Sequence, residues 1–161
     1  VPKNIISKKN ILHIHIRSGD LFSKKFPHQE YICPPISFYK KIIEEKEWEK
    51  IILICEDYGN PCMRRLLKLY KDKIEYKKQS LEKDIKLILE AENIVFGMGS
   101  FVPSLLWISN NIKKIYYPSN AHKHYIEKDD LEFLEINIKN YLKKIGKWRN
   151  IKSQYTIMIT N

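Results

Sequence analysis

The chain has 161 residues, of which 43% are hydrophobic and 30% charged, a balance that is typical of a folded globular protein and excludes a disordered one. Lysine and arginine number 29 against 19 aspartates and glutamates, which gives a net charge of +10 and favours anionic partners. No apolar run approaches the roughly 20 residues that a membrane helix needs. The sequence begins without an apolar leader segment and without an initiator methionine.

Cys33, Cys55 and Cys62 are odd in number and contain no CxxC pair. This pattern is unlike a zinc site or a complete disulfide framework, so we expect neither. Together with the missing leader, it favours a cytoplasmic location, with association to the membrane face left open. A Golgi-lumen protein whose anchor lies outside this sequence would have the same features.

Hydrophobic patterning predicts that strands and helices alternate along the chain. Apolar runs predict five strands, over residues 11–16, 50–55, 73–76, 93–96 and 113–117. Amphipathic spacing predicts helices over residues 38–47, 61–70, 81–92, 101–109 and 129–144. Sequence signals for helix starts are Ser37, Asn60 followed by Pro61, and Ser80. Residues 22–35 and 119–128 are predicted loops, and residues 148–161 fit a short strand and a docked coil equally well.

Strands that alternate with helices form parallel sheets with helices on both faces. With right-handed crossovers, we predict an α/β, Rossmann-like sheet of strand order 3-2-1-4-5, in one domain over residues 1–161. In that order the first and fourth strands are neighbours. The loops that leave their carboxyl ends, residues 17–20 and 97–100, are therefore expected to face each other across one crevice.

These two loops carry residues suited to an anion. Arg17 offers a planar set of donors that matches phosphate oxygens, although a charged surface turn explains this segment alone equally well. Residues 97–100 (Gly-Met-Gly-Ser) lie between a strand and a helix, where free N–H groups bind anions, but such a turn is commonly only structural. The loop is neither a GxGxxG motif nor a Walker loop. Taken together, the two loops favour a diphosphate-binding crevice.

Other polar residues allow two interpretations each. Glu56 and Asp57 close the second strand and would bind a base or ribose, or form a solvated loop. Asp84 lies in the first turn of its helix, where the helix dipole alone favours a carboxylate. His15 alternates with His13 along the first strand, so one of them is expected to face the core. The spacing defines neither a nucleophile–base set nor a metal site.

Two motifs resemble the fucosyltransferases of the GT-B class, which include the α1,2-, α1,6- and protein O-fucosyltransferases. Residues 15–20 (His-Ile-Arg-Ser-Gly-Asp) resemble the HxRxxD-type motif of these enzymes. The later motif is an aspartate, an apolar helix, an alanine, an apolar strand and a serine-rich turn, and residues 84–101 are similar to it. The motifs also match in order and spacing, and the resemblance covers residues 11–115.

The resemblance implies a metal-independent enzyme that uses GDP-fucose as co-substrate, with no cofactor and no nucleic-acid partner. It implies that Arg17 binds the β-phosphate and assists departure of the leaving group, and that Asp20 braces the loop. His15, Ser18 and Gly19 belong to the same motif. Ser100 and the N–H groups from Gly99 to Phe101 would hold the diphosphate, and Asp57 and Asp84 match positions that contact guanosine or order the site.

The sequence departs from the family pattern at two places. Ser18 stands where some members have a second arginine, and Gly99-Ser100 replaces a double serine, which leaves the sugar more open than the nucleotide. The chain resembles the C-terminal, donor-binding half of a larger enzyme with an N-terminal acceptor-side domain. The general base would lie on that other part, or be His28 or Glu30. The alternative function is a non-catalytic basic domain that binds nucleic acid or an anionic surface; a different phosphate enzyme is disfavoured by the missing glycine fingerprints.

Overall fold

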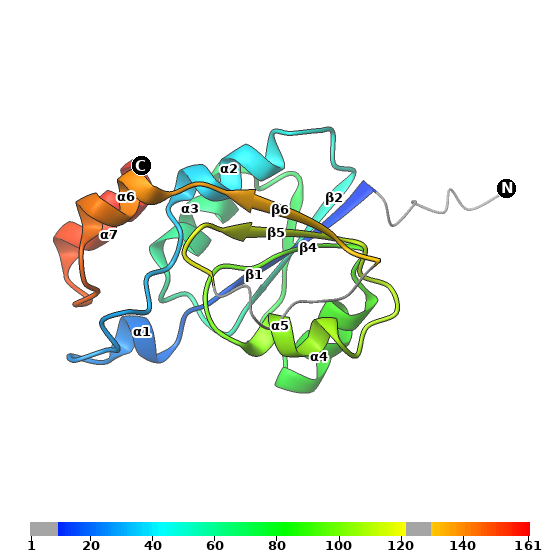
Figure 1. The fold of residues 1–161 in the computed structure, drawn as a ribbon, viewed down its shortest axis with the longest axis horizontal. Helices are drawn as coiled ribbons and strands as arrows, with labels where there is room; N and C mark the ends of the chain where they lie inside the picture. The colour runs from blue at the N-terminus through cyan, green and yellow to red at the C-terminus, as the bar shows by residue number, and fades with distance from the viewer. Residues whose placement is uncertain (1–9, 122–129) are drawn as a thin grey trace, which may run out of the picture.

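The chain folds around a parallel sheet of six strands (Figure 1). This computed structural model describes residues 10–121 and 130–161. The strands are Ile11–Ile16 (β1), Lys50–Cys55 (β2), Ile74–Tyr76 (β3), Asn93–Val95 (β4), Lys114–Pro118 (β5) and Glu132–Ile136 (β6). Their order is β3-β2-β1-β4-β5-β6, and every neighbouring pair is parallel. The order predicted for the first five strands is confirmed, but the prediction that the sheet has only five is wrong.

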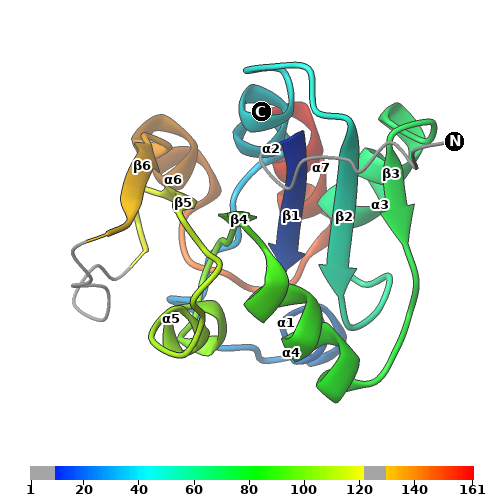
Figure 2. The ribbon, with the colours of Figure 1, turned by 90° about the vertical axis from the view of Figure 1, so that its right-hand side faces the viewer.

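Helices cover both faces of the sheet, as predicted. They are Asp20–Ser23 (α1), Ile36–Ile43 (α2), Pro61–Leu69 (α3), Leu81–Glu90 (α4), Phe101–Leu106 (α5), Lys139–Ile145 (α6) and Lys152–Thr160 (α7). Helices α2, α3, α6 and α7 lie on one face, and α4 and α5 lie on the other (Figure 2). Of the described helices, none is long and apolar enough to cross a membrane.

Two of the three predicted helix starts are confirmed. The Asn60 side chain accepts a hydrogen bond of 2.9 Å from the Cys62 N–H, and the Ser80 side chain accepts one of 3.3 Å from the Lys83 N–H. The Ser37 prediction is wrong, because α2 begins at Ile36, two residues before the predicted start, and its N-cap residue is Pro35. The Ser37 N–H instead donates to the backbone carbonyl of Asn161, 2.9 Å away, so the end of α7 satisfies this helix start.

The predictions for the C-terminal third are wrong in two places. The helix predicted over residues 129–144 is β6 followed by α6, and the tail is helix α7 rather than a strand or a coil. Strand β6 is an edge strand with exposed Glu132 and Glu135, and such charged edge strands are easily taken for an amphipathic helix. In α7, burial of Met158 and Gln154 outweighs the strand preference of its isoleucines and threonines. Residues 122–129, most of the predicted second loop, lie outside the described residues.

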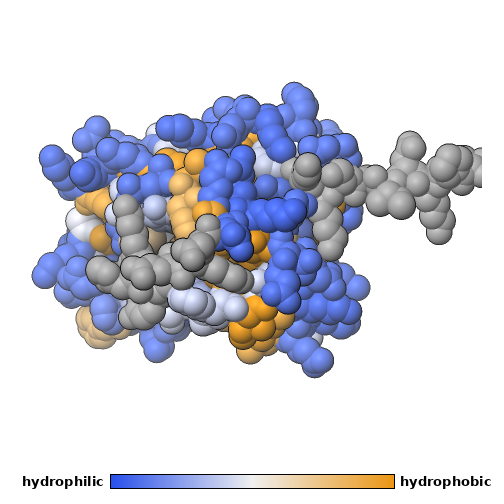
Figure 3. Space-filling model, turned by 45° about the vertical axis from the view of Figure 1, so that its right-hand side comes forward, coloured by the Kyte–Doolittle hydropathy of each residue, from blue (hydrophilic) through white to orange (hydrophobic). Residues whose placement is uncertain are grey.

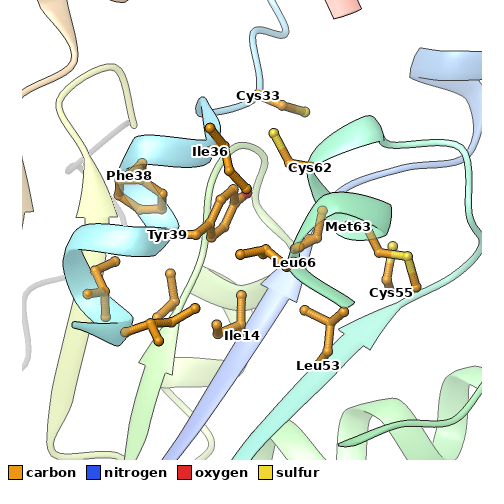
Figure 4. Packing of buried hydrophobic residues seen from close by; sticks show 14 of the residues in the cluster. Ile14, Cys33, Ile36, Phe38, Tyr39, Leu53, Cys55, Cys62, Met63 and Leu66 are labelled. Atoms are coloured by element: carbon orange, nitrogen blue, oxygen red, sulfur yellow. The ribbon is translucent and has the colours of Figure 1, made fainter. Parts of the chain in front are cut away.

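The core has two parts, one on each side of the sheet. On the larger side, Tyr39 of α2 and Met63 and Leu66 of α3 pack over Ile14 and Leu53 of the sheet (Figure 4). All three cysteines are buried in this part as free thiols. Burial raises the pKa of Cys33 and of Cys55 to about 12, so both thiols are protonated and unreactive at neutral pH. Their role is packing.

Hydrophilic side chains cover most of the face drawn in Figure 3, with smaller apolar areas between them. This agrees with a chain in which 30% of residues are charged. The surface at the carboxyl ends of the strands contains the cavity that forms the candidate site.

Candidate functional site

A cavity of about 540 Å³ opens at the carboxyl ends of β1, β2 and β4. Its walls come from four parts of the chain: the end of β1 with α1, the loop after α1, the end of β2 with the start of α4, and the loop between β4 and α5. The lining residues are His15, Ile16, Arg17, Asp20, Leu21, His28, Tyr31, Glu56, Leu81, Asp84, Met98, Gly99, Ser100 and Phe101. The two loops predicted to share one crevice, residues 17–20 and 97–100, therefore both contribute to it.

The register of the sheet explains which residues meet. Ile14 of β1 pairs with Val95 of β4, so Arg17 and Met98 are each three residues further toward the same edge. On the other side, Ile16 pairs with Cys55, which places Arg17 level with Glu56. The segment after β4 also lies close to Pro34, and this contact depends on Gly97, because a Cβ at position 97 would lie 2.7 Å from the Pro34 ring carbon Cδ.

Arg17 is held by two carboxylates at the mouth of the cavity. One guanidinium nitrogen lies 2.5 Å from Asp20 Oδ1, and the other lies 2.6 Å from Glu56 Oε1. Burial alone would raise the pKa of Asp20, but Arg17 and Lys24 outweigh it and lower this pKa below its ordinary value. Asp20 is therefore ionised at neutral pH and braces the arginine. The Arg17 side chain stays 30% exposed, so its donors remain within reach of a ligand.

Ser18 and Asp57 point away from the cavity and hold the loop together. Ser18 is fully buried; its hydroxyl donates to Asp57 Oδ1 and accepts a 3.0 Å hydrogen bond from the Asn60 N–H. The same Asp57 oxygen accepts from the Gly59 N–H at 2.8 Å and the Gly19 N–H at 3.5 Å. Burial alone would raise the pKa of Asp57, but these hydrogen bonds outweigh the effect of burial and lower the pKa below its ordinary value. The structure thus separates Ser18, Gly19 and Asp57 from the residues that line the cavity.

His15 lines the cavity as a neutral imidazole. Burial, helped by the charge of Arg17, lowers its pKa to about 4. Its ring lies against that of Phe101, with the ring centres 5.2 Å apart, so a residue of β1 and the first residue of α5 form one wall. His13, two residues earlier, is buried in the sheet, which confirms that one of the pair faces the core.

The remaining predicted residues lie opposite Arg17 or at the far end of the cavity. Gly99 has a φ of 96° and, with Ser100 and Phe101, forms the turn into α5. Asp84 lines the cavity from the first turn of α4, and burial raises its pKa, with a hydrogen bond from Gln79 acting in the opposite direction. Three carboxylates therefore share this cavity with one arginine, although the whole chain carries a charge of +10.

Sequence analysis considered Glu56 and Asp57 together and kept only Asp57 for the predicted site, yet Glu56 is the residue that meets Arg17. The available signal was the alternation of side chains at the end of a strand, because two consecutive residues there point to opposite sides. Tyr31 was also not selected. It lines the cavity beside His28, with the two ring centres 5.1 Å apart.

Gly19 provides a test of how tightly this loop is built. Its φ is 61°, and a Cβ at this position would overlap the Glu56 carboxylate. Gly146 has a similar φ of 66°, but a Cβ at this position would meet no atom within 4 Å. A substitution at Gly146 therefore measures the cost of backbone strain without a steric overlap. We expect Gly146→Ala to lower the free energy of unfolding by about 1–3 kcal/mol, because its φ of 66° and ψ of −155° are essentially restricted to glycine, and Gly19→Ala to cost about 1 kcal/mol more because Glu56 must leave Arg17. Urea unfolding would measure both.

The additional variant Glu56→Ala removes the overlap at Gly19. In that background, Gly19→Ala should cost no more than Gly146→Ala. An equal cost of the two glycine variants when Glu56 is present would contradict the packing described for this loop.

Comparison of the chain with family models, with curated proteins and with solved structures finds no match. Within residues 10–121 and 130–161, no group of three or more His, Cys, Asp or Glu side chains could hold a metal ion.

Proposed function

We propose that this chain is the donor-binding domain of an inverting, metal-independent glycosyltransferase. Its donor would be a nucleotide-sugar, with GDP-fucose as the first candidate, and its acceptor a hydroxyl of a glycan or a protein. The observation that carries the proposal is the position of Arg17, at the end of the central strand β1 and across one cavity from the turn at Gly99–Phe101. Charge develops on the diphosphate as it departs, and a fixed guanidinium stabilises that charge.

The charges in the cavity favour a nucleotide-sugar over a bare polyanion. Arg17 suits a diphosphate, while Glu56 and Asp84 repel one. The hydroxyl and N–H groups of a sugar, ribose and base can donate hydrogen bonds to those carboxylates. A ligand that combines one diphosphate with many donors thus fits this set of side chains better than a nucleic-acid backbone does.

The fold is compatible with this proposal. A parallel sheet with helices on both faces, and a ligand at the switch between β1 and β4, is the Rossmann-like arrangement expected for the C-terminal half of a GT-B enzyme. His28 remains a candidate for the acceptor side, because it lines the cavity from the loop after α1. Its Nδ1 accepts a 3.3 Å hydrogen bond from the Glu30 N–H, which leaves Nε2 to face a ligand.

The experiment that tests this function compares GDP with GMP. We expect GDP to raise the melting temperature of the full chain and GMP to do so much less, because the second phosphate supplies the group that Arg17 would bind. A free GDP concentration one hundred times the dissociation constant would stabilise the folded protein by about 2.7 kcal/mol. The shift should be the same with EDTA as with Mg²⁺.

A random single-stranded oligonucleotide serves as the competing ligand. No shift with GDP, together with oligonucleotide binding that weakens steeply as salt increases, would replace the proposal by the non-catalytic alternative.

A further inference from the structure

A second surface, next to the cavity, has features that the proposed function does not use. Residues 137–161 contain six basic residues and no acidic residue. They form α6, α7 and the turn between them, at the left edge of the molecule in Figure 1. The loop after α1 reaches the same edge.

Three hydrogen bonds join the turn between α6 and α7 to α1 and to the loop that follows α1. The Trp148 N–H donates to the Gln29 carbonyl at 2.9 Å, and Trp148 Nε1 donates to the Leu21 carbonyl at 2.8 Å. Asn150 Nδ2 donates to the Lys24 carbonyl at 3.0 Å. The loop and the α6–α7 turn therefore form one continuous surface, although they are more than 100 residues apart in sequence.

This surface combines cations with protruding apolar side chains. The Phe26 side chain is 85% exposed, and the Lys25 ammonium lies 5.6 Å from the centre of its ring. Ile151 is also exposed, and it follows Asn150 directly. We call this surface the basic corner; it consists of Lys25, Phe26, Lys147, Arg149, Ile151 and Lys152.

The four cations of the basic corner, Lys25, Lys147, Arg149 and Lys152, are exposed. Within the part of the chain that the structure describes, none of the four forms an ion pair. Lys24, by contrast, is 3.4 Å from Asp20 and is partly neutralised. An anionic partner could therefore bind these four cations without first breaking any of the ion pairs described here.

We propose that the basic corner docks the protein on an anionic lipid bilayer, with Phe26 and Ile151 entering the interface and the cations contacting lipid head groups. Basic residues beside exposed aromatic and aliphatic side chains are the pattern of interfacial membrane binding. An isoleucine has no ring on which a base can stack, so the pair of apolar side chains fits a bilayer better than a nucleic acid.

The position of the basic corner has a consequence for the acceptor. The loop that carries Lys25 and Phe26 also supplies His28 and Tyr31 to the cavity wall. This consequence rests on the proposed function: if the cavity binds a nucleotide-sugar, docking through the basic corner presents the cavity to an acceptor anchored in the same bilayer.

Flotation with vesicles tests the docking on the full chain and without nucleotide. The chain should bind vesicles of equal parts phosphatidylcholine and phosphatidylglycerol, and bind phosphatidylcholine vesicles far less. The triple variant Lys25→Gln/Lys147→Gln/Arg149→Gln should bind the anionic vesicles about a hundredfold more weakly, at about fivefold for each charge. Phe26→Ser should cost about tenfold, because its ring no longer enters the interface.

The control is Lys77→Gln/Lys83→Gln/Lys86→Gln, which removes three exposed charges from the connection before α4 and from α4 itself. Helix α4 lies on the opposite face of the sheet, so this control should change vesicle binding by less than about threefold. An equal loss in the control and the basic-corner variant would overturn the proposal.

Ile151→Ser separates a bilayer from a nucleic acid. This variant should weaken vesicle binding, and since serine is a good N-cap residue, α7 should remain folded. Unchanged vesicle binding, together with a random oligonucleotide that loses affinity only in the basic-corner triple variant, would assign the surface to nucleic acid and overturn the proposal. The GDP shift should persist in every one of these variants, so that failure of docking and failure of the proposed function are distinguished.

Discussion

Replacement of Arg17 with alanine is expected to weaken GDP binding by about a hundredfold, on the basis of about 1.5–3 kcal/mol for hydrogen bonds to a charged group. Two effects act together in this variant. The diphosphate loses its cationic partner, and it then faces Asp20, Glu56 and Asp84 with no arginine between them. Isothermal titration calorimetry would measure the change.

Folding should be little affected, because both ion pairs of Arg17 are made at partly exposed carboxylates, with side chains 45% and 53% accessible. Such pairs contribute about 0–1 kcal/mol each. A weakened GDP affinity with a nearly unchanged melting temperature of the free protein is therefore the expected signature.

Three further variants make the interpretation specific. Arg17→Lys keeps the charge but loses the planar set of donors, and we expect a loss of about tenfold. Arg65→Ala removes an exposed arginine from α3 and should leave GDP affinity unchanged. Glu56→Gln should tighten binding, because it removes the carboxylate that competes for Arg17. Wild-type GDP affinity in Arg17→Ala would refute the role assigned to this residue.

Replacement of Asn60 with alanine is expected to lower the free energy of unfolding by about 3–4 kcal/mol. Asn60 is fully buried, and its side chain has two tasks. Its oxygen accepts from the Cys62 N–H and caps α3, and its Nδ2 donates to the Arg17 carbonyl at 2.9 Å. The alanine variant leaves both backbone groups without this partner, in addition to losing the cap.

Ser80→Ala is the matched control, because Ser80 caps α4 from an exposed position and, among the described residues, its side chain makes only the cap hydrogen bond. It should cost about 1 kcal/mol. Chemical denaturation of both variants isolates the contribution of the contact between Asn60 and Arg17. GDP affinity should also fall in Asn60→Ala and not in Ser80→Ala, since only the former releases the backbone of Arg17. Equal losses of stability would show that the cap alone explains Asn60.

Sequence reasoning located the cavity because its main elements follow from local patterns. The apolar runs that became β1, β2 and β4 are long or are bounded by clear turn residues, and parallel strands bring their carboxyl ends to one edge. Asn60 shows the limit of this reasoning. Its place before Pro61 predicted the helix start correctly, whereas its contact with Arg17, 43 residues away, depends on tertiary structure.

Alternation along a strand indicates that consecutive side chains point to opposite sides, but the sequence alone does not indicate which of the two sides faces the cavity. Ser18 and Asp57 bond to each other in the interior of the loop, while Arg17 and Glu56, their immediate neighbours, face the cavity. Ser18 is of particular interest because some members of the resembled family have an arginine there. In this chain the position is fully buried, so the fold has no room for a second exposed guanidinium at that point.

The central position of β1 also determines how the cavity can fluctuate. Strands β2 and β4 are hydrogen-bonded to its two sides, and its residues Leu12 and Ile14 are completely inaccessible. Amide protons in such a strand exchange with solvent only when the whole fold opens. Arg17 follows this strand directly, whereas residues 28–30 are exposed in a loop. We therefore expect the amide protons of the β1 wall of the cavity to exchange only with opening of the whole fold, and those of residues 28–30 in the loop wall to exchange by smaller, local openings.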